Sequence, residues 1–422
     1  ISKGYFVDQQ SHNVEPQWIK NIWQDKLKRF PVSEKIKKDL LSWKYAKDLP
    51  NDDHMTNAWL DSMTYKDFIE KVMGLDEAVT RFADPVLASA GGMGCDVMSA
   101  YIAKQLGMYG LYPDAPVNPV NRHSFPGGND GFARHFVKLL IPDSISGKNS
   151  FEDIMNNPIN FNRLDHRDSR VRLRLSSNVI NVHHKSESVN VTYYKNNELT
   201  KVNAKAVVMA SGGWINKHII SDLPKSHKEA YDQFNHAPML VANVALTNWR
   251  FLKKLGITAY QWSGGFGFHT NIRKPMHVGN YKPDLDPDKP ITLTFYVSFE
   301  KTNQGLSATE QSRLGQYEML GKSFMQYERE IREQMVRMFS SSGFDPKNDI
   351  AGIILNRWGH AYVTPTPGFF YTPEGDPGYA DIIKTKPFGR VSFGHSELRG
   401  YQHWGPAAAE GSRAVDQISE YI

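Results

Sequence analysis

The most constraining feature of this chain is an uninterrupted apolar run at residues 206–210, which leads directly into Ser211, Gly212 and Gly213. A strand with one face in water alternates polar and apolar residues, whereas an uninterrupted run is typical of a strand buried on both faces, as in parallel sheets. The glycines let the chain turn sharply where the run ends. The pattern predicts a parallel sheet within an α/β layer.

Other segments carry weaker secondary-structure signals. Short Val- and Tyr-rich stretches predict strands, and Asn196 with Asn197 predicts a hairpin turn between two of them. These expected strands lie at residues 171–175, 179–182, 189–194, 201–209, 239–246, 291–299, 350–355 and 390–393. Apolar residues at helical spacing, with capping residues such as Thr64 and Ser307, predict helices. The expected helices lie at residues 16–30, 33–43, 64–72, 132–140 and 307–339, with a terminal helix from Pro406.

Composition excludes several classes of protein. The 422 residues include 40% hydrophobic residues, which is enough to bury a core, and no stretch approaches the ~20 apolar residues of a membrane helix, so we expect a soluble protein. Cys95 is the single cysteine, which rules out an internal disulfide, a CxxC pair and a multi-cysteine zinc site. The net charge of +5 comes from charges mixed along the chain, so nucleic-acid binding has little support.

Four short segments carry the candidate chemistry, each weak alone and more specific in their combined order. They are Phe-Pro-Gly-Gly at 125–128, the strands around Val179 and 206–213, Asn-Arg-Trp-Gly-His-Ala-Tyr at 356–362, and Gly-Arg-Val-Ser-Phe-Gly-His-Ser-Glu at 389–397 followed by Trp-Gly-Pro-Ala-Ala-Ala-Glu-Gly-Ser-Arg-Ala at 404–414. In this order the segments resemble the flavin-containing amine oxidoreductase family, most closely its spermidine dehydrogenase-like branch. The resemblance covers almost the whole chain.

The resemblance implies an α/β fold with an α+β substrate part, the two-dinucleotide-binding-domain flavoprotein fold of the amine oxidase type. It divides the chain into a helical substrate-side region (1–122), a FAD-domain segment (123–221), a substrate-binding sheet with a long helix (222–340) and a return to the FAD domain (341–422). It implies FAD as cofactor, and oxidation of an amine, most readily a polyamine such as spermidine, by hydride transfer to flavin N5. This branch also implies haem b, a cytochrome acceptor and a periplasmic location.

By the same resemblance, one set of residues would hold FAD. Val179 would lie against the adenine, Gly394 would let the backbone approach the cofactor, and Glu397 would hydrogen-bond the ribityl or pyrophosphate region. Ser211, Gly212 and Ser396 belong to the same set. Gly405 removes bulk, Pro406 is preset for a first helical turn, and the Ala407 amide would point from a helix N-terminus, where partial positive charge favours reduced flavin. An ordinary Gly-Pro helix start with small residues for packing is the alternative.

A second set would face the substrate: Trp358, His360, Tyr362, His403 and Trp404. Aromatic walls exclude water and can hold an amine by its alkyl groups or as a cation over a ring. The reacting amine must be neutral, and burial lowers the pKa of an ammonium in that direction. The two histidines are candidates for proton transfer, although a lone histidine is more often a structural hydrogen-bonding group.

Two departures from the family pattern stand out. Trp214 follows the Ser-Gly-Gly turn where related sequences have another polar or aromatic turn, which predicts a different pocket shape. A strand followed by GxGxxG is also missing, because Thr270 stands where the stretch at Gly265 and Gly267 would need its third glycine. Three explanations stay open: the N-terminal βαβ unit lies outside this sequence, which opens at Ile1 without a Met; a second polypeptide supplies it; or the protein is a cofactor-free structural or binding subunit.

Overall fold

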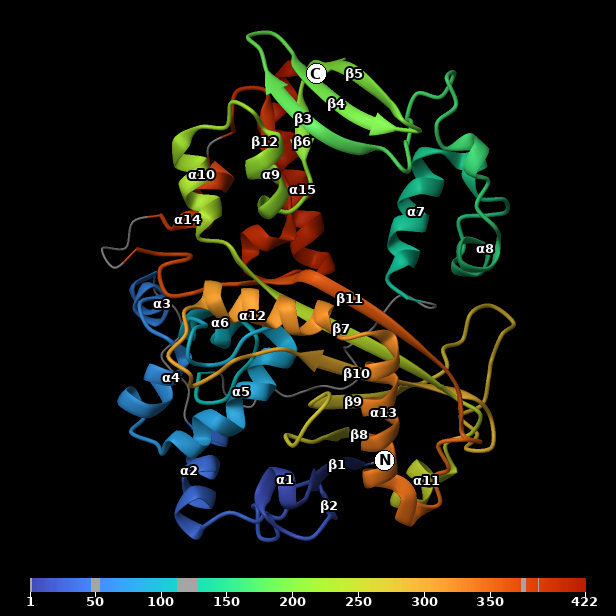
Figure 1. The fold of residues 1–422 in the computed structure, drawn as a ribbon. Helices are drawn as coiled ribbons and strands as arrows, with labels where there is room; N and C mark the ends of the chain where they lie inside the picture. Colours follow the sequence, from blue (N-terminus) through green and yellow to red (C-terminus); the bar gives the residue numbers. More distant parts are fainter. Residues whose placement is uncertain (1, 47–53, 112–127, 373–376, 386) are drawn as a thin grey trace.

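The computed structural model describes residues 2–46, 54–111, 128–372, 377–385 and 387–422. The predicted Phe-Pro-Gly-Gly loop lies outside these ranges except for its last glycine. Within them the chain forms three sheets with helices around them (Figure 1). No helix in these ranges has the length and apolar character needed to span a bilayer.

A mixed seven-stranded sheet occupies the lower half of the view in Figure 1. Its strand order is β11-β7-β10-β9-β8-β1-β2, and β1 runs parallel to β8 while the other pairs are antiparallel. The strands are β1 (Ser2–Val7), β2 (Gln17–Lys20), β7 (Asn235–Leu246), β8 (Ile257–Gln261), β9 (His269–Arg273), β10 (Ile291–Ser298) and β11 (Ile350–Thr364). β7 and β11 pair over almost their full length, from Leu246 opposite Ile350 to Asn235 opposite Thr364.

Helices cover the two sides of this sheet. The apolar side forms one core with α11 (Arg250–Leu255), α12 (Ala308–Gly321) and α13 (Phe324–Phe339), including the buried residues Leu240, Phe295 and Met335. Ser307 and Ser323 begin α12 and α13 with capping boxes. A second core joins β1 to the N-terminal helices α2 (Glu34–Lys44), α5 (Glu77–Gly91) and α6 (Ala100–Gln105). Shorter helices α1 (Gln9–His12), α3 (His54–Asp61) and α4 (Tyr65–Asp67) complete this part.

A smaller α/β part stands above the sheet in Figure 1. The parallel pair β6 (Val207–Met209) and β12 (Val391–Phe393) is surrounded by α9 (Gly213–Ile219), α10 (Lys225–Asp232), α14 (Tyr379–Thr385) and α15 (Trp404–Ile418). The two strands share a third core with α9, α10 and α14. An antiparallel meander follows at β3 (Asn178–His184), β4 (Val189–Lys195) and β5 (Glu198–Ala204). α7 (Asp130–Leu140) and α8 (Phe151–Asn156) lie beside it.

Most predicted elements are confirmed, including the parallel strand 206–210 and the Asn196–Asn197 turn, whose φ values of 50° and 63° suit asparagine. Four predictions are wrong. Residues 16–30 form β2 and turns, because Asn21, Lys26 and Leu27 have positive φ and cannot continue a helix. Residues 171–175 form no strand, and two arginines there bind Asp165 instead. The expected helix 307–339 breaks between α12 and α13, and the expected strand 201–209 divides into β5 and β6.

Candidate functional site

The parallel pair β6–β12 brings two predicted segments together. Val207, Val208 and Met209 lie opposite Val391, Ser392 and Phe393, so the turn at 211–213 and the segment 394–397 leave the sheet at the same edge. Ligands of open α/β sheets bind at such carboxyl ends of parallel strands. The structure therefore brings together two segments that the sequence resemblance assigns to the cofactor, and their contact with a cofactor stays a prediction.

Glu397 is buried at this edge and links both segments to β7. Its carboxylate accepts a hydrogen bond from the Gly213 N–H and contacts the His236 ring, with 2.8 Å between Glu397 Oε2 and His236 Nε2. The His395 ring lies at 3.6 Å from the same oxygen. Its two oxygens thus have protein partners, and its contact with a cofactor stays a prediction.

Gly394 lets α15 pack closely against the parallel pair. A side chain there would meet Ala414 at 3.0 Å, the Glu410 carbonyl oxygen at 3.2 Å and Val208 at 3.2 Å. The Gly394 backbone thus lies close to α15, whereas the sequence resemblance implies a close approach to the cofactor. Ser396, two residues later, is buried.

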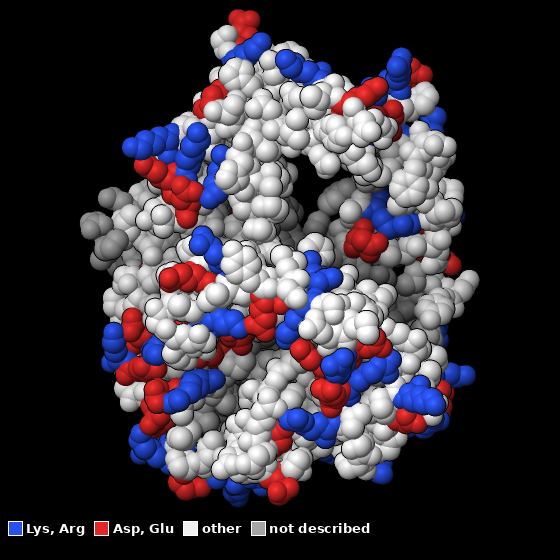
Figure 2. Space-filling view, viewed as in Figure 1, with Lys and Arg blue, Asp and Glu red and all other residues white. Residues whose placement is uncertain are grey.

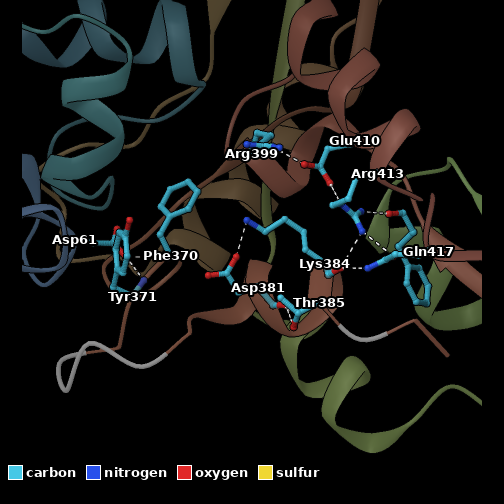
Figure 3. Close-up of polar contacts among 11 residues, drawn as sticks. Asp61, Phe370, Tyr371, Asp381, Lys384, Thr385, Arg399, Glu410, Arg413 and Gln417 are labelled. Atoms are coloured by element: carbon cyan, nitrogen blue, oxygen red, sulfur yellow. Dashed lines mark hydrogen bonds and ion pairs between the residues drawn. The ribbon is translucent and has the colours of Figure 1, made fainter. Parts of the chain in front are cut away.

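A buried carboxylate anchors α15. Glu410 accepts from Arg399 and from Arg413, whose Nε lies 2.8 Å from Glu410 Oε2 (Figure 3). Arg413 also donates to the backbone oxygen of Lys384 at 2.8 Å and to that of Phe393. The helix is therefore tied to α14 and β12 along one side, which fixes the direction in which its N-terminus points.

The N-terminus of α15 is open. The helix begins at Trp404, two residues earlier than predicted, so the Ala407 N–H donates to the His403 carbonyl oxygen and is not free as expected. The N–H groups without an intrahelical acceptor at this end belong to Trp404 and Gly405. Ala407 and Gly405 are exposed, Pro406 is half-buried, and a side chain at Gly405 would have no neighbour within 4 Å.

A hollow opens beside this helix end. Figure 2 shows it between α15 and α7, with the meander above it and β11 below. Trp404 stacks on Phe132 of α7 with ring centroids 4.0 Å apart, so these two elements are bridged by aromatic contact. Val179 and Trp358 are 40% and 59% exposed on β3 and β11, and Ser211 is exposed after β6. Several predicted cofactor and substrate residues are thus surface residues without a covering partner among the described part of the chain.

His360 on β11 belongs to a group of rings next to Glu397. It stacks on Trp214 of α9 with centroids 4.0 Å apart and 9° between the planes, and the His236 ring lies at 5.7 Å. Burial lowers the pKa of His360, and His236 adds to the decrease against the opposing effect of Glu397. The lowered pKa favours the neutral form of His360, which can accept a proton.

Sequence reasoning missed several residues near this group. His236 and Trp214 were not predicted as site residues, and neither were the polar residues of the sheet side opposite α13, which include His269 and Tyr296. On that side, burial raises the pKa of Tyr362 and nearby Tyr296 adds to the increase. The alternation of His, Asn and Arg with buried residues along β9 was the signal that could have identified this side.

Asp61 fixes the loop after β11. It is fully buried, and its Oδ2 accepts from the N–H groups of Phe370 and Tyr371 at 2.8 and 3.0 Å (Figure 3). Burial raises its pKa to about 6 from an ordinary value of 3.8. Because the folded chain keeps this proton to higher pH than the unfolded chain, the free energy of unfolding should fall as pH rises from about 4 to about 6.

We expect Asp61→Asn to flatten this pH dependence. The asparagine oxygen can keep both backbone hydrogen bonds, and the substitution removes the titrating charge. A pKa difference of about two units between the folded and unfolded chains corresponds to about 3 kcal/mol of pH-dependent free energy of unfolding. Urea unfolding at pH 4 and pH 7 measures the change, with exposed Asp416→Asn as the control. Equal pH dependence in Asp61→Asn and the unmodified chain would contradict the assignment.

No protein-family model matches the chain, and no curated protein sequence matches it either. Its fold is similar to solved structures of putrescine oxidase, including the wild type bound to putrescine, at 15% identity over 99% of this chain and 81% of that chain, with a TM-score of 0.55. Cyclohexylamine oxidase from Brevibacterium oxydans IH-35A is similar over 99% of this chain and 80% of that chain, at 14% identity and a TM-score of 0.51. The predicted fold, that of the amine oxidase flavoproteins, is confirmed.

Proposed function

We propose that this protein is a FAD-dependent oxidoreductase that oxidises an amine at the carbon next to nitrogen. The observation that carries the proposal is the open N-terminus of α15, which borders the hollow in Figure 2 within a fold shared over 99% of the chain with amine oxidases. The parallel strands end at the same place, which is where such folds bind nucleotide cofactors.

The residues around the hollow suit a bound flavin nucleotide. Gly405 offers space that a side chain would fill, and the free N–H groups of α15 provide partial positive charge toward an anion. Val179 and Ser211 are exposed. As the sequence resemblance implies, Val179 would contact the adenine, and Ser211, in the turn after β6, would also contact FAD. When bound, FAD would accept the hydride from the amine carbon.

The chain's own side chains would prepare the amine. Trp358 and Trp404 provide apolar surface that excludes water, and a desolvated amine loses its proton more readily. His360, which stacks on Trp214 and whose lowered pKa favours the neutral form, would take that proton. His403 stays a predicted substrate-facing residue at the exposed start of α15.

The remaining substrate and partner predictions rest on the sequence resemblance. Spermidine is the first polyamine to test, and haem b and a cytochrome acceptor stay predictions. A second polypeptide with a dinucleotide-binding unit would find an available edge, because β6 and β12 pair only with each other among the described residues. The exposed small residues of α15 would give such a unit a flat surface to pack on.

The alternative is a cofactor-free binding or structural subunit. The specific observation in its favour is that the Glu397 oxygens contact Gly213 and His236, so this residue has a role without any cofactor. The same fold would then be kept for its surface alone.

Visible absorption of the purified protein decides between them. We expect a flavin band, present as isolated or after addition of FAD, that bleaches when an oxidisable amine is added without oxygen. A bound flavin that no amine bleaches would remove the amine assignment, and failure to bind FAD at all would favour the cofactor-free subunit.

A further inference from the structure

Two cationic side chains and a histidine share the side of the seven-stranded sheet that faces away from α13. The register sets Lys3 of β1 opposite Ala259 of β8, and Ala259 opposite Asn271 of β9. Because side chains alternate along a strand, His269 and Arg273 point to the same side as Asn271, while Ile272 between them is buried in the α13 core. Lys3, His269 and Arg273 are called the cationic face below.

The cationic face has neutral partners. Arg273 Nε donates to Thr294 Oγ1 at 3.0 Å, and its guanidinium donates to the Tyr296 hydroxyl and lies 5.5 Å from that ring. The Lys3 ammonium makes no hydrogen bond or ion pair with any described residue. Burial lowers the pKa of His269 to about 4, and Lys3 and Arg273 contribute to the decrease. Two cations, Lys3 and Arg273, that have no carboxylate partner among the described residues would be stabilised by an anion.

One member of the cationic face, Lys3, also lines a pocket. This pocket of about 280 Å³ is bordered by Lys3 together with Tyr5, Trp23, Tyr109 and Gln261. Apolar walls with a cation and an amide are the composition of a site that orients a small ligand with one charged end.

The cationic face is continuous with the proposed amine site. The Tyr296 hydroxyl, which binds Arg273, is close enough to Tyr362 to raise the pKa of that phenol. Tyr362 follows His360 by two residues on β11. One side of the sheet therefore leads from the ring cluster at His360 to Arg273 and Lys3.

Carboxylates at the neighbouring end of β10 accept hydrogen bonds from protein donors. Asp84 accepts from the Cys95 N–H at 2.8 Å and from the Asn303 amide at 3.0 Å. Asp96 Oδ2 accepts from the Asn303 N–H and from Gln311, both at 3.0 Å, and Asp96 Oδ1 is buried. Burial raises the pKa of Glu300, which favours its neutral form. These acids hold protein segments together, so they are poor partners for the second ammonium of a diamine.

We propose that the substrate is an amine that also carries an anionic group, such as a carboxylate, and that Lys3 and Arg273 bind this group. This inference rests on the proposed amine oxidation and changes the expected substrate class from a polyamine to an amino acid-like amine. Arg273 would offer two N–H groups in a plane, which suits a carboxylate, and Lys3 would add a point charge from the pocket side.

Three five-carbon probes test the inference: 5-aminopentanoate, 1,5-diaminopentane and pentylamine. Isothermal titration calorimetry of the protein, with and without FAD, measures their affinities. We expect 5-aminopentanoate to bind most tightly, and Lys3→Gln and Arg273→Gln each to weaken it by at least about tenfold. Pentylamine affinity should not change, and Lys254→Gln, which removes an exposed lysine on α11, is the matched control.

The outcomes separate this inference from the proposed function. Tighter binding of 1,5-diaminopentane, or equal affinities in the variants and the unmodified protein, would overturn the anion site even if amines bleach the flavin. Binding of 5-aminopentanoate that depends on Lys3 and Arg273, without flavin reduction by any amine, would keep the anion site and remove the oxidase assignment. Arg273→Lys retains the charge and should recover part of the lost affinity, which excludes misfolding as the cause.

Discussion

Replacing Glu397 by alanine is expected to lower the free energy of unfolding by about 3 kcal/mol, because it leaves a buried ring nitrogen and a buried N–H without partners. The carboxylate is almost fully enclosed and contacts both Gly213 and His236. Its loss separates β7 from the turn that follows β6. Urea unfolding followed by tryptophan fluorescence measures the change.

Two further variants make the Glu397 result specific. Glu397→Gln keeps an oxygen for the Gly213 N–H and should lose less than the alanine variant. Glu229→Ala removes an exposed carboxylate of α10 and should stay within about 0.5 kcal/mol of the unmodified protein. A Glu397→Ala variant as stable as Glu229→Ala would show that the buried contacts contribute nothing.

Replacing Gly405 by leucine is expected to weaken FAD binding by at least about tenfold while leaving the free chain as stable or slightly more stable. A Cβ at this position has no neighbour within 4 Å, so the free chain accommodates the added side chain, which would occupy space that the proposed cofactor needs. Leucine also favours the helix more than glycine, by about 0.8 kcal/mol. Quenching of flavin fluorescence during titration measures affinity, and urea unfolding measures stability.

Gly321→Leu is the matched control for the hollow. Gly321 ends α12, and a side chain there also has no neighbour within 4 Å. Its FAD affinity should equal that of the unmodified protein. If Gly405→Leu bound FAD equally well, the N-terminus of α15 would not be a cofactor contact, and the proposed function would lose its main support.

Local signals explain what the sequence predicted correctly. Ser307 and Thr64 accept from backbone N–H groups three residues later, so a short pattern was enough to locate both helix starts. The five-residue apolar run at 206–210 likewise was enough to predict a parallel strand. The structure adds that its valines are only half-buried, because β6 has a single neighbour among the described residues.

Long-range contacts explain which elements and site residues the sequence did not predict. Trp18 and Ile19 have helical spacing with Ile22, yet they form β2 because β1 offers a pairing partner, and left-handed residues follow. Glu397 and His236 are 161 residues apart, so no local pattern announces their contact. The cationic face depends on the register of three strands and is likewise absent from any single segment.

The long pair β7 and β11 has a mechanical consequence. Its residues enter all three cores, with Leu246 and Ile350 in the core under α13, Ala237 in the N-terminal core and Val363 in the core around β12. Rotating one core against another would break the hydrogen-bonded ladder that both share. We therefore expect the amine-binding side and the cofactor side to move as one rigid body, and a ligand to enter through rearrangement of connecting loops and not through hinge opening.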